Sequence, residues 1–194
     1  MAKGVDPIAR FNSWFKEAQR AKVALPEAMV VATSDLKGHV SARWVLLKEA
    51  TPEGFVFFTN TRSPKGRDLD ENPYASLVFY WDPIGKQVRI SGRTDKVAPE
   101  EADAYWLTRP RQSCLAAVAS SQSESVASRA VLLQRLKVLT HQYRGKPIPR
   151  PPHWSGYRVR PEEIEFWRRR AYRLHERELF VAGRGGWRHS FLQP

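Results

Sequence analysis

Short apolar runs separated by turn residues dominate the first hundred residues, which is typical of β-strands rather than of long helices. The exception is the start of the chain, where Asp6 and Pro7 suit a helix N-cap and first turn and apolar residues recur at helical spacing up to Ala18. We therefore expect a helix over residues 7–21. Strands are predicted at 28–33, 40–48, 55–60, 74–81 and 87–97, with a second helix starting at Ser63-Pro64. This half of the chain is expected to be mainly antiparallel sheet.

The second half mixes helical and strand patterns. Pro99 opens a predicted helix that ends before Pro110, and the residues from 126 to 144 carry apolar positions at helical spacing. The Ser-rich stretch 112–128 is interpreted as a functional loop, and 147–152 as a proline-rich connector. Later strands are predicted at 154–160, 163–168, 172–181 and 187–192, with a tight turn at 183–186. The pattern favours a mainly β, α+β fold, a closed or nearly closed barrel with flanking helices, in a single domain over 1–194.

Composition supports a folded chain outside the membrane. Hydrophobic residues make up 42% and charged residues 27% of the 194 positions, which is close to the average for globular proteins. No apolar run approaches the roughly 20 residues that span a bilayer, and the first ten residues lack the apolar stretch of a signal peptide. The single cysteine, Cys114, excludes an internal disulfide and a cysteine-based zinc cluster. We expect a cytoplasmic protein without a bound metal.

Positive charge is concentrated near the end of the chain. The formal net charge is +12, and residues 144–194 hold twelve Lys or Arg against five Asp or Glu. Within this region Trp167 precedes the run from Arg173 to Arg177, which includes His175. Guanidinium groups stack on flat rings and pair with phosphate, so the run suits a wall that binds a flat anion. The alternative is a solvated basic hairpin, because sign alone does not identify a ligand.

Two further segments carry groups that bind phosphate. Residues 59–67 pass from a strand into a helix N-terminus, where backbone N–H groups, hydroxyls and cations together form an anion site. Near Pro110, the side chains of Tyr105, Arg109, Arg111 and Ser113 are donors matched to a phosphate monoester. Arg43 and Lys48, five apart on a predicted strand, are expected to point to opposite faces. Motifs for metalloproteases, P-loops and dinucleotide-binding folds are missing.

Taken in order, these segments resemble the pyridoxamine (pyridoxine) 5′-phosphate oxidase family over nearly the whole chain. The motifs that carry the resemblance are Arg43–Lys48, Phe58–Asn60, Ser63–Lys65, Gln87-Val88, Tyr105–Ser113, Ser121–Ser123, Ile164–Trp167 and Arg173–Arg177. The resemblance implies an FMN-binding split β-barrel and a homodimer with FMN at the subunit interface. It also implies oxidation of pyridoxamine or pyridoxine 5′-phosphate to pyridoxal 5′-phosphate with O2 as acceptor and release of H2O2.

The resemblance also implies site residues. The FMN contacts are Arg43, Trp44, Val45, Leu46, Leu47, Lys48, Phe58, Thr59, Ser63, Lys65, Gln87, Gln122, Ser123, Trp167 and Arg177, with Gln122 and Ser123 coming from the partner subunit. The substrate phosphate is held by Lys48, Tyr105, Arg109 and Ser113, while Arg173 and His175 hold the pyridine ring as the catalytic pair.

Some positions depart from the family pattern. Pro64 stands where the family has an Arg, Phe58 where it has a Tyr, Arg168-Arg169 where it has Gln-Gly, and Phe191 where it has an Arg. Only Met1–Val5 precede the first helix, so the family's segment that closes over substrate is nearly absent.

Two alternative functions remain open at this stage. The phenazine-biosynthesis flavin oxidase shares the fold and resembles the chain at Lys65–Arg67 and Leu174–Arg177. The phosphate-binding set favours the vitamin B6 reaction over it. A nucleic-acid-binding module, supported by the net charge, seven Trp residues and the run Arg168–Arg170, ranks third because no binding motif accompanies them.

Overall fold

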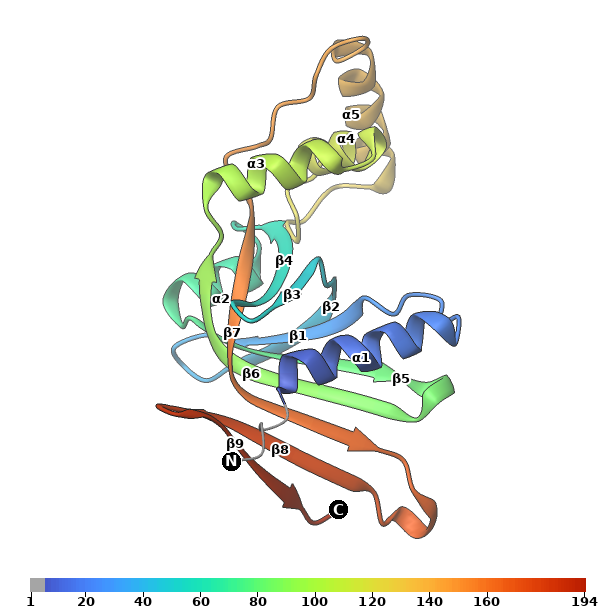
Figure 1. Ribbon diagram of the computed structural model, residues 1–194. Coiled ribbons are helices and arrows are strands. Elements are labelled where there is room, and N and C mark those ends of the chain that lie inside the picture. Colours follow the sequence, from blue (N-terminus) through green and yellow to red (C-terminus); the bar gives the residue numbers. More distant parts are fainter. Residues whose placement is uncertain (1–5) are drawn as a thin grey trace.

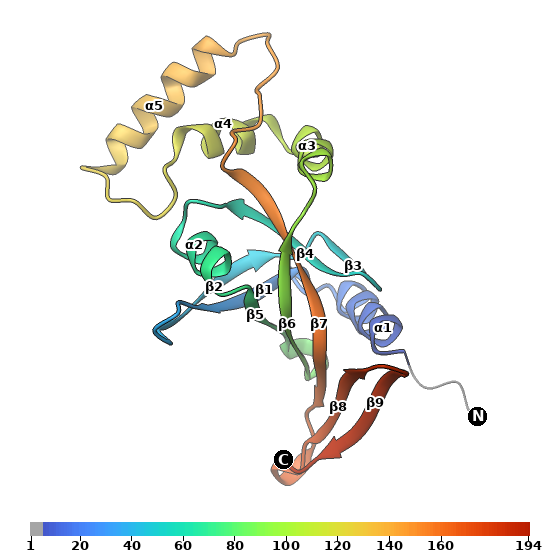
Figure 2. The same ribbon diagram turned by 90° about the vertical axis from the view of Figure 1, so that its left-hand side faces the viewer.

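A curled antiparallel sheet forms the body of the molecule in the computed structural model, which describes residues 6–194 (Figures 1 and 2). Along the sheet the strands follow the order β2-β1-β5-β6-β7-β4-β3, and β8 and β9 continue outward from β7. The bounds are β1 Ala28–Ser34, β2 Val40–Leu46, β3 Glu49–Thr51, β4 Gly54–Asn60, β5 Tyr74–Trp81, β6 Lys86–Lys96, β7 Trp154–Arg168, β8 Glu176–Gly183 and β9 Gly186–Leu192. The predicted mainly β, split-barrel fold is confirmed.

Helix α1 (Pro7–Arg20) covers one face of this sheet. The Asp6 carboxylate accepts a hydrogen bond from the backbone N–H of Ile8 at 2.9 Å and so caps the helix, as its sequence predicts. The fully buried ring of Phe11 packs edge-on against Phe55 and Phe79, with centroids 4.9 and 5.0 Å apart. Burial of these rings fixes the helix on the sheet. Residues 1–5, which include the short N-terminal segment noted above, lie outside the described residues.

One long strand, β7, replaces the two strands predicted at 154–160 and 163–168. Pro161 and Glu162 lie inside it, opposite a register shift between Ser91 and Gly92 of β6. Glu162 is the extra residue of a β-bulge at this point. The bulge accommodates Pro161, which lacks the backbone N–H that a regular strand ladder requires. Gly92 makes the close approach possible, because a Cβ there would lie 1.9 Å from the carbonyl oxygen of Arg160. The strand therefore runs from the helical end of the molecule to the outer hairpin.

Three helices gather at one end of the sheet: α3 (Pro99–Thr108), α4 (Arg111–Ala119) and α5 (Arg129–Gln142) (Figure 1). Helix α4 corrects the expected loop over 112–128, of which only 120–128 lies outside a helix. Small residues hide its helical period, but Cys114 and Leu115 are buried. The chain turns at 120–128 and re-enters as α5.

The remaining elements are short. Helix α2 (Pro64–Glu71) begins at the predicted Ser63-Pro64 start, and the turns η1 (Asp82–Ile84) and η2 (Ala171–Arg173) precede β6 and β8. Strand β3, which pairs with β4, was not predicted, and β8 begins at Glu176 rather than at 172 because η2 occupies the segment before it. None of the helices between residues 6 and 194 combines the length and apolar character needed to cross a bilayer.

Candidate active site

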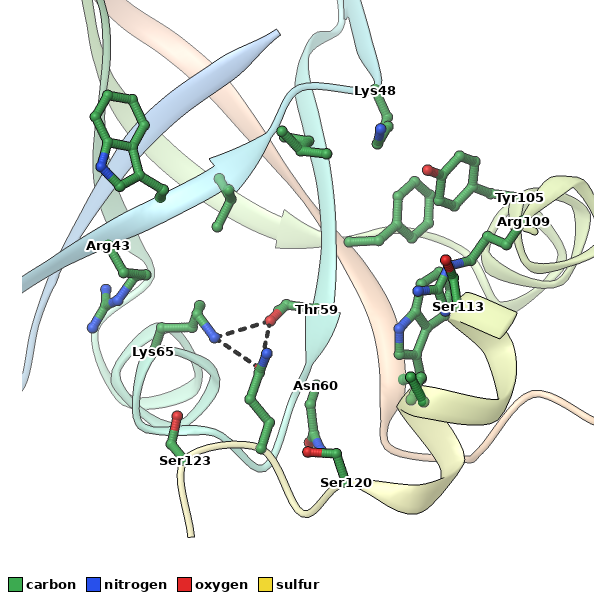
Figure 3. A pocket seen from close by; sticks show the side chains of 18 of the residues that line it. Arg43, Lys48, Thr59, Asn60, Lys65, Tyr105, Arg109, Ser113, Ser120 and Ser123 are labelled. Atoms are coloured by element: carbon green, nitrogen blue, oxygen red, sulfur yellow. Dashed lines mark hydrogen bonds between the residues drawn. The ribbon is translucent and has the colours of Figure 1, made fainter. Parts of the chain in front are cut away.

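A cavity of about 910 Å³ lies between the sheet and the helical end of the molecule (Figure 3). Its walls come from β2, β4, the start of α2, the end of α3, α4 and the turn that follows α4. The predicted site residues that line it are Arg43, Trp44, Val45, Leu46, Lys48, Phe58, Thr59, Lys65, Tyr105, Arg109, Ser113, Gln122 and Ser123. Four of these are cations, and no carboxylate of the described chain lines the cavity. The cavity is thus suited to an anionic ligand.

Lys65 forms the centre of one end of the cavity. It lies in the first turn of α2 and is buried, with 6% of its surface exposed. Its Nζ donates hydrogen bonds to Thr59 Oγ1 at 3.0 Å and to Gln122 Oε1 at 2.9 Å (Figure 3). It also donates to Ser63 Oγ at 3.0 Å. Burial, with a smaller effect from Arg43, lowers the pKa of Lys65 to about 8. Ser63 itself does not line the cavity, but its hydroxyl holds the Lys65 amine in position through this hydrogen bond.

Gln122 and Ser123 reach this end from the same chain, which corrects the expectation that a partner subunit supplies them. Gln122 Oε1 also accepts a hydrogen bond from Thr59 Oγ1 at 3.1 Å. The chain leaves α4 at Ala119 and turns back toward β4, with Ser123 in the left-handed region at φ 69°. This local turn brings both residues to the start of α2, a path that the residue pattern did not reveal.

Strand β2 supplies Arg43 beside Lys65. Its Nη1 donates to Thr33 Oγ1 at 2.7 Å, and that hydroxyl in turn donates to Asp68 Oδ2 at 2.6 Å. Burial lowers the pKa of Arg43, and the charge of Asp68 acts in the opposite direction. The guanidinium is thus held in place on the strand while it faces the cavity.

Lys48 lines the same cavity as Arg43, so the predicted opposite orientation is wrong. The prediction assumed a regular strand to residue 48, but β2 ends at Leu46. The backbone N–H of Leu47 donates to Glu27 O at 2.9 Å and that of Lys48 to Val56 O at 2.8 Å, which turns the chain. Leu47 itself packs into the core and does not line the cavity.

Arg109 forms the centre of the other end, on the opposite side in Figure 3. Its guanidinium carbon lies 4.6 Å from the ring centroid of Trp154 and 5.0 Å from that of Trp106. The Nη1 atom is buried and has no hydrogen-bond partner among residues 6–194. Burial lowers the pKa of Arg109. A buried guanidinium nitrogen without an acceptor is costly, so this end of the cavity is built for an anionic ligand.

Aromatic rings form the wall beside Arg109. Tyr105 stacks on Phe58 with centroids 4.1 Å apart, and Phe58 stacks on Trp154 at 5.3 Å. Lys48 Nζ lies 5.9 Å from the centroid of Tyr105, and Ser113 lines the same cavity, so the four residues predicted to hold a phosphate meet here. Arg111 does not join them, because it bonds the carbonyl oxygens of Lys146 and Tyr143.

Five predicted site residues form a second group away from this cavity: Gln87, Trp167, Arg173, His175 and Arg177. Gln87, Trp167 and Arg177 are directly opposite one another across β6, β7 and β8. The ring of His175 lies 4.6 Å from that of Trp167, and Arg177 Nε donates to Glu165 Oε1 at 2.8 Å. The predicted site is therefore divided between two surfaces of one chain.

The cavity also has lining residues that sequence reasoning missed. They are Asn60, Pro64, Pro110, Ala116, Ala117, Ser120 and Trp154. Asn60 and Pro64 belong to the segment 59–67 that was predicted to form an anion site, although neither was predicted to be a contact residue. Trp154 is the wall behind Arg109, and its position follows from the pairing of β4 with β7, in which it lies opposite Asn60. That pairing joins segments almost a hundred residues apart, and the sequence signal was only a strand start.

Two family models match the chain. Residues 15–143 match pyridoxamine 5′-phosphate oxidase, and residues 154–194 match the pyridoxine 5′-phosphate oxidase C-terminal dimerisation region. Curated relatives named pyridoxine/pyridoxamine 5′-phosphate oxidase include one from Rubrobacter xylanophilus, 50% identical over 97% of this chain and 87% of its own length. Another, from Myxococcus xanthus, is 49% identical over 97% of this chain and 92% of its own length.

Solved structures agree with the fold. PhzG from Burkholderia lata, solved in complex with tetrahydrophenazine-1-carboxylic acid, matches with a TM-score of 0.94 and 33% identity, over 100% of this chain and 95% of its own. An FMN-binding protein from Nostoc punctiforme related to pyridoxamine 5′-phosphate oxidase matches with a TM-score of 0.79 over 98% of this chain and 100% of its own. It is 15% identical, so this second likeness concerns the fold.

Proposed function

Because the chain belongs to the pyridoxamine 5′-phosphate oxidase family, we propose that it oxidises pyridoxamine and pyridoxine 5′-phosphates to pyridoxal 5′-phosphate. It is an FMN-dependent oxidoreductase and a homodimer. O2 is the electron acceptor and H2O2 the second product. A cytoplasmic location stays a prediction.

The observation that carries the proposal is the pair of cationic ends in one cavity. FMN and the B6 vitamer each bring a phosphate group, and the cavity offers Lys65 with Arg43 at one end and Arg109 with Lys48 at the other. Basic groups at both ends match two separate phosphates better than they match one ligand with a single charged group.

The residues at the Lys65 end fit the phosphate of FMN. Nζ of Lys65 faces the hydroxyls of Thr59 and Ser63, and the first turn of α2 presents backbone N–H groups. Pro64 lacks the side-chain donor that an Arg would bring, so the guanidinium at this end of the cavity is that of Arg43, whose charge acts on Lys65. The residues that would hold FMN here are Arg43, Trp44, Val45, Leu46, Lys48, Phe58, Thr59, Lys65, Gln122 and Ser123.

The second group of residues would complete the cavity of the other subunit. Gln87, Trp167 and Arg177 share one row of the sheet and lie outside their own chain's cavity, within or beside the segment that matches a dimerisation region. In the homodimer, the partner subunit's Trp167 and the partner subunit's Arg177 would face the flavin. FMN is thus proposed to lie at the subunit interface.

The substrate phosphate is assigned to the Arg109 end. Lys48, Tyr105, Arg109 and Ser113 would hold it, with the orphan Nη1 of Arg109 as a donor. The partner subunit's Arg173 and the partner subunit's His175 would hold the pyridine ring as the catalytic pair. A planar guanidinium stacks on a ring, which an ammonium group does less well.

The chemistry that FMN supplies when bound is acceptance of a hydride from C4′ of the vitamer and delivery of the electrons to O2. The protein residues bind and orient. Arg109 would hold the phosphate and Arg173 the ring, so the vitamer would have one orientation in the site. This orientation lowers the entropic part of the activation barrier. The stack of Tyr105, Phe58 and Trp154 excludes water from one wall and strengthens the charge contacts there.

A phenazine-type oxidase is the second candidate, because the fold likeness to PhzG extends over the whole chain. That reaction would place a carboxylate where the vitamer phosphate lies. The set of four donors at the Arg109 end favours a phosphate, which offers more acceptor oxygens than a carboxylate.

The test replaces Arg109 with Ala and compares pyridoxamine 5′-phosphate with pyridoxamine as substrates. We expect kcat/KM for the phosphorylated substrate to fall on the order of 100-fold, the value of a buried charge-assisted contact, while FMN content stays unchanged. Arg111→Ala is the matched control, because its guanidinium lies outside the cavity and bonds main-chain oxygens. Equal loss in both variants, or a wild-type protein that oxidises only a reduced phenazine, would contradict the proposal.

A further inference from the structure

Arg169 ties the segment after β7 to the neighbouring turn η1. Its backbone N–H donates to the carbonyl oxygen of Gly85 at 2.8 Å, and its guanidinium bonds Asp82 Oδ1 at 2.5 Å and the hydroxyl of Tyr80. Gly85 is required there, since it adopts φ +59° and a Cβ would lie 3.1 Å from Cβ of Arg169. The attachment therefore uses both the main chain and the side chain of one residue.

Arg170, the next residue, bonds the far end of the turn that follows, at His175 and Glu176. Its guanidinium donates two hydrogen bonds to the Glu176 carboxylate, at 2.8 and 3.0 Å. Its backbone N–H donates to His175 Nδ1 at 3.1 Å. This bond needs a lone pair on Nδ1, so the hydrogen of the neutral ring is on Nε2. Arg170 thus sets which nitrogen of His175 can donate.

The turn between Arg170 and His175 has a strained backbone. Tyr172 and Arg173 both adopt left-handed backbone conformations, with φ of 56° and 60°. This conformation is unfavourable for a residue other than glycine, and such strain persists only where the flanking structure holds it. The side chain of Tyr172 is almost wholly exposed, so its own packing does not supply that support. The support must come from the residues at the ends of the turn.

We propose that Arg169 is a positioning residue for the catalytic pair. By its bonds to Asp82 and Gly85 it fixes the start of the turn, so that the N–H of Arg170 holds His175 with its hydrogen on Nε2 and Arg173 keeps its left-handed conformation. The proposal rests on the proposed function, in which Arg173 and His175 contact the substrate. It assigns a task to an arginine at a position where the family pattern has a glycine.

The test compares the wild type with Arg169→Ala, Asp82→Asn and the double variant, using protein labelled with ¹⁵N in histidine. In the wild type, Nδ1 of His175 should give a signal without a bound hydrogen and Nε2 a signal with one. In each variant the two signals should move toward each other as the tautomers exchange. We expect kcat for pyridoxamine 5′-phosphate to fall on the order of tenfold, with FMN content unchanged and KM little altered. The double variant should lose no more than either single variant, because one contact is removed in all three.

Arg160→Ala is the control, because Arg160 is another exposed arginine paired with an aspartate, Asp95, but it lies away from the turn. The proposal is wrong if the His175 signals of Arg169→Ala stay at wild-type positions or if the kcat of Arg169→Ala matches that of Arg160→Ala. It is also wrong if the losses of kcat in Arg169→Ala and Asp82→Asn add in the double variant. Absence of turnover in the wild type would instead contradict the proposed function. The histidine signals would then still decide whether Arg169 sets the tautomer.

Discussion

Two cations, Lys65 and Arg109, determine the chemistry of the site at the residue scale. Both are buried enough for their pKa values to be lowered, and the two lie at opposite ends of one cavity. Both could be predicted from the sequence as phosphate-binding residues, because a phosphate needs cationic hydrogen-bond donors. The source of Gln122 could not, since the turn that returns it to Lys65 of the same chain depends on α4, whose small residues hide a helix.

The lowered pKa of Lys65 predicts a pH dependence of FMN binding. Below about 8 the amine is charged and attracts the phosphate, and above about 8 it becomes neutral in the FMN-free protein. The wild-type affinity for FMN should therefore decline as the pH rises from 7 to about 9.5, in measurements by quenching of flavin fluorescence. Lys65→Met should bind FMN on the order of tenfold more weakly at pH 7 and show a flatter profile. Parallel profiles would contradict the role of this amine.

The same pKa predicts a stability effect with a definite sign. Between about pH 8 and the ordinary lysine pKa of 10.5, Lys65 binds fewer protons in the folded state than in the unfolded state. Stability of the FMN-free protein should thus rise with pH across this window relative to Lys65→Met. Urea unfolding of both proteins at pH 7.5 and 10 measures the difference. A stability difference that stays constant or falls between these pH values would contradict the lowered pKa of Lys65.

At the scale of elements, β7 joins the cavity to the outer hairpin and depends on one bulge. The strands themselves follow from alternation and turn residues, and most predicted strand ends agree with the structure to within about two residues. The unbroken length of β7 does not follow, because Pro161 predicts a break unless β7 itself carries a bulge, which it has at Glu162. Strand β3 was missed because three residues are too few to give a pattern.

Gly92 is the residue at which this bulge can be tested. Gly92→Ala places a Cβ against the carbonyl oxygen of Arg160 and should destabilise the protein by about 2–4 kcal/mol. Gly185→Ala is the control, because a Cβ there meets nothing within 4 Å. Thermal and urea unfolding of both variants give the comparison. Equal stability of the two would mean that β6 and β7 tolerate a side chain at the bulge.

At the scale of the whole molecule, the division of the predicted site between two surfaces is the feature with the widest consequence. The pattern of residues along one chain does not show which residues meet across a subunit boundary. The types of the site residues could therefore be predicted from the sequence, but their division between two surfaces could not. The homodimer explains the division if each cavity takes its second group from the other subunit.

Co-expression of two inactive variants tests this arrangement. One subunit carries Arg109→Ala in the cavity, and the other carries Trp167→Ala in the second group. Half of the dimers in a random mixture combine the two, and each of these regains one intact site, so activity should recover to about a quarter of wild type. The pair Lys48→Ala with Arg109→Ala is the control and should show no activity beyond that of the two variants alone, since both residues belong to the same cavity. Recovery in the control, or none in the test pair, would contradict the shared site.

The central claim is that the cavity holds FMN and a phosphorylated B6 vitamer together. Its most direct test is the visible absorbance of the purified protein, reconstituted with FMN and then mixed with pyridoxamine 5′-phosphate without oxygen. We expect a flavin spectrum that bleaches on addition of the vitamer and returns when O2 is admitted. A bound flavin that stays oxidised would contradict the substrate, and a protein that takes up no FMN would contradict the site itself.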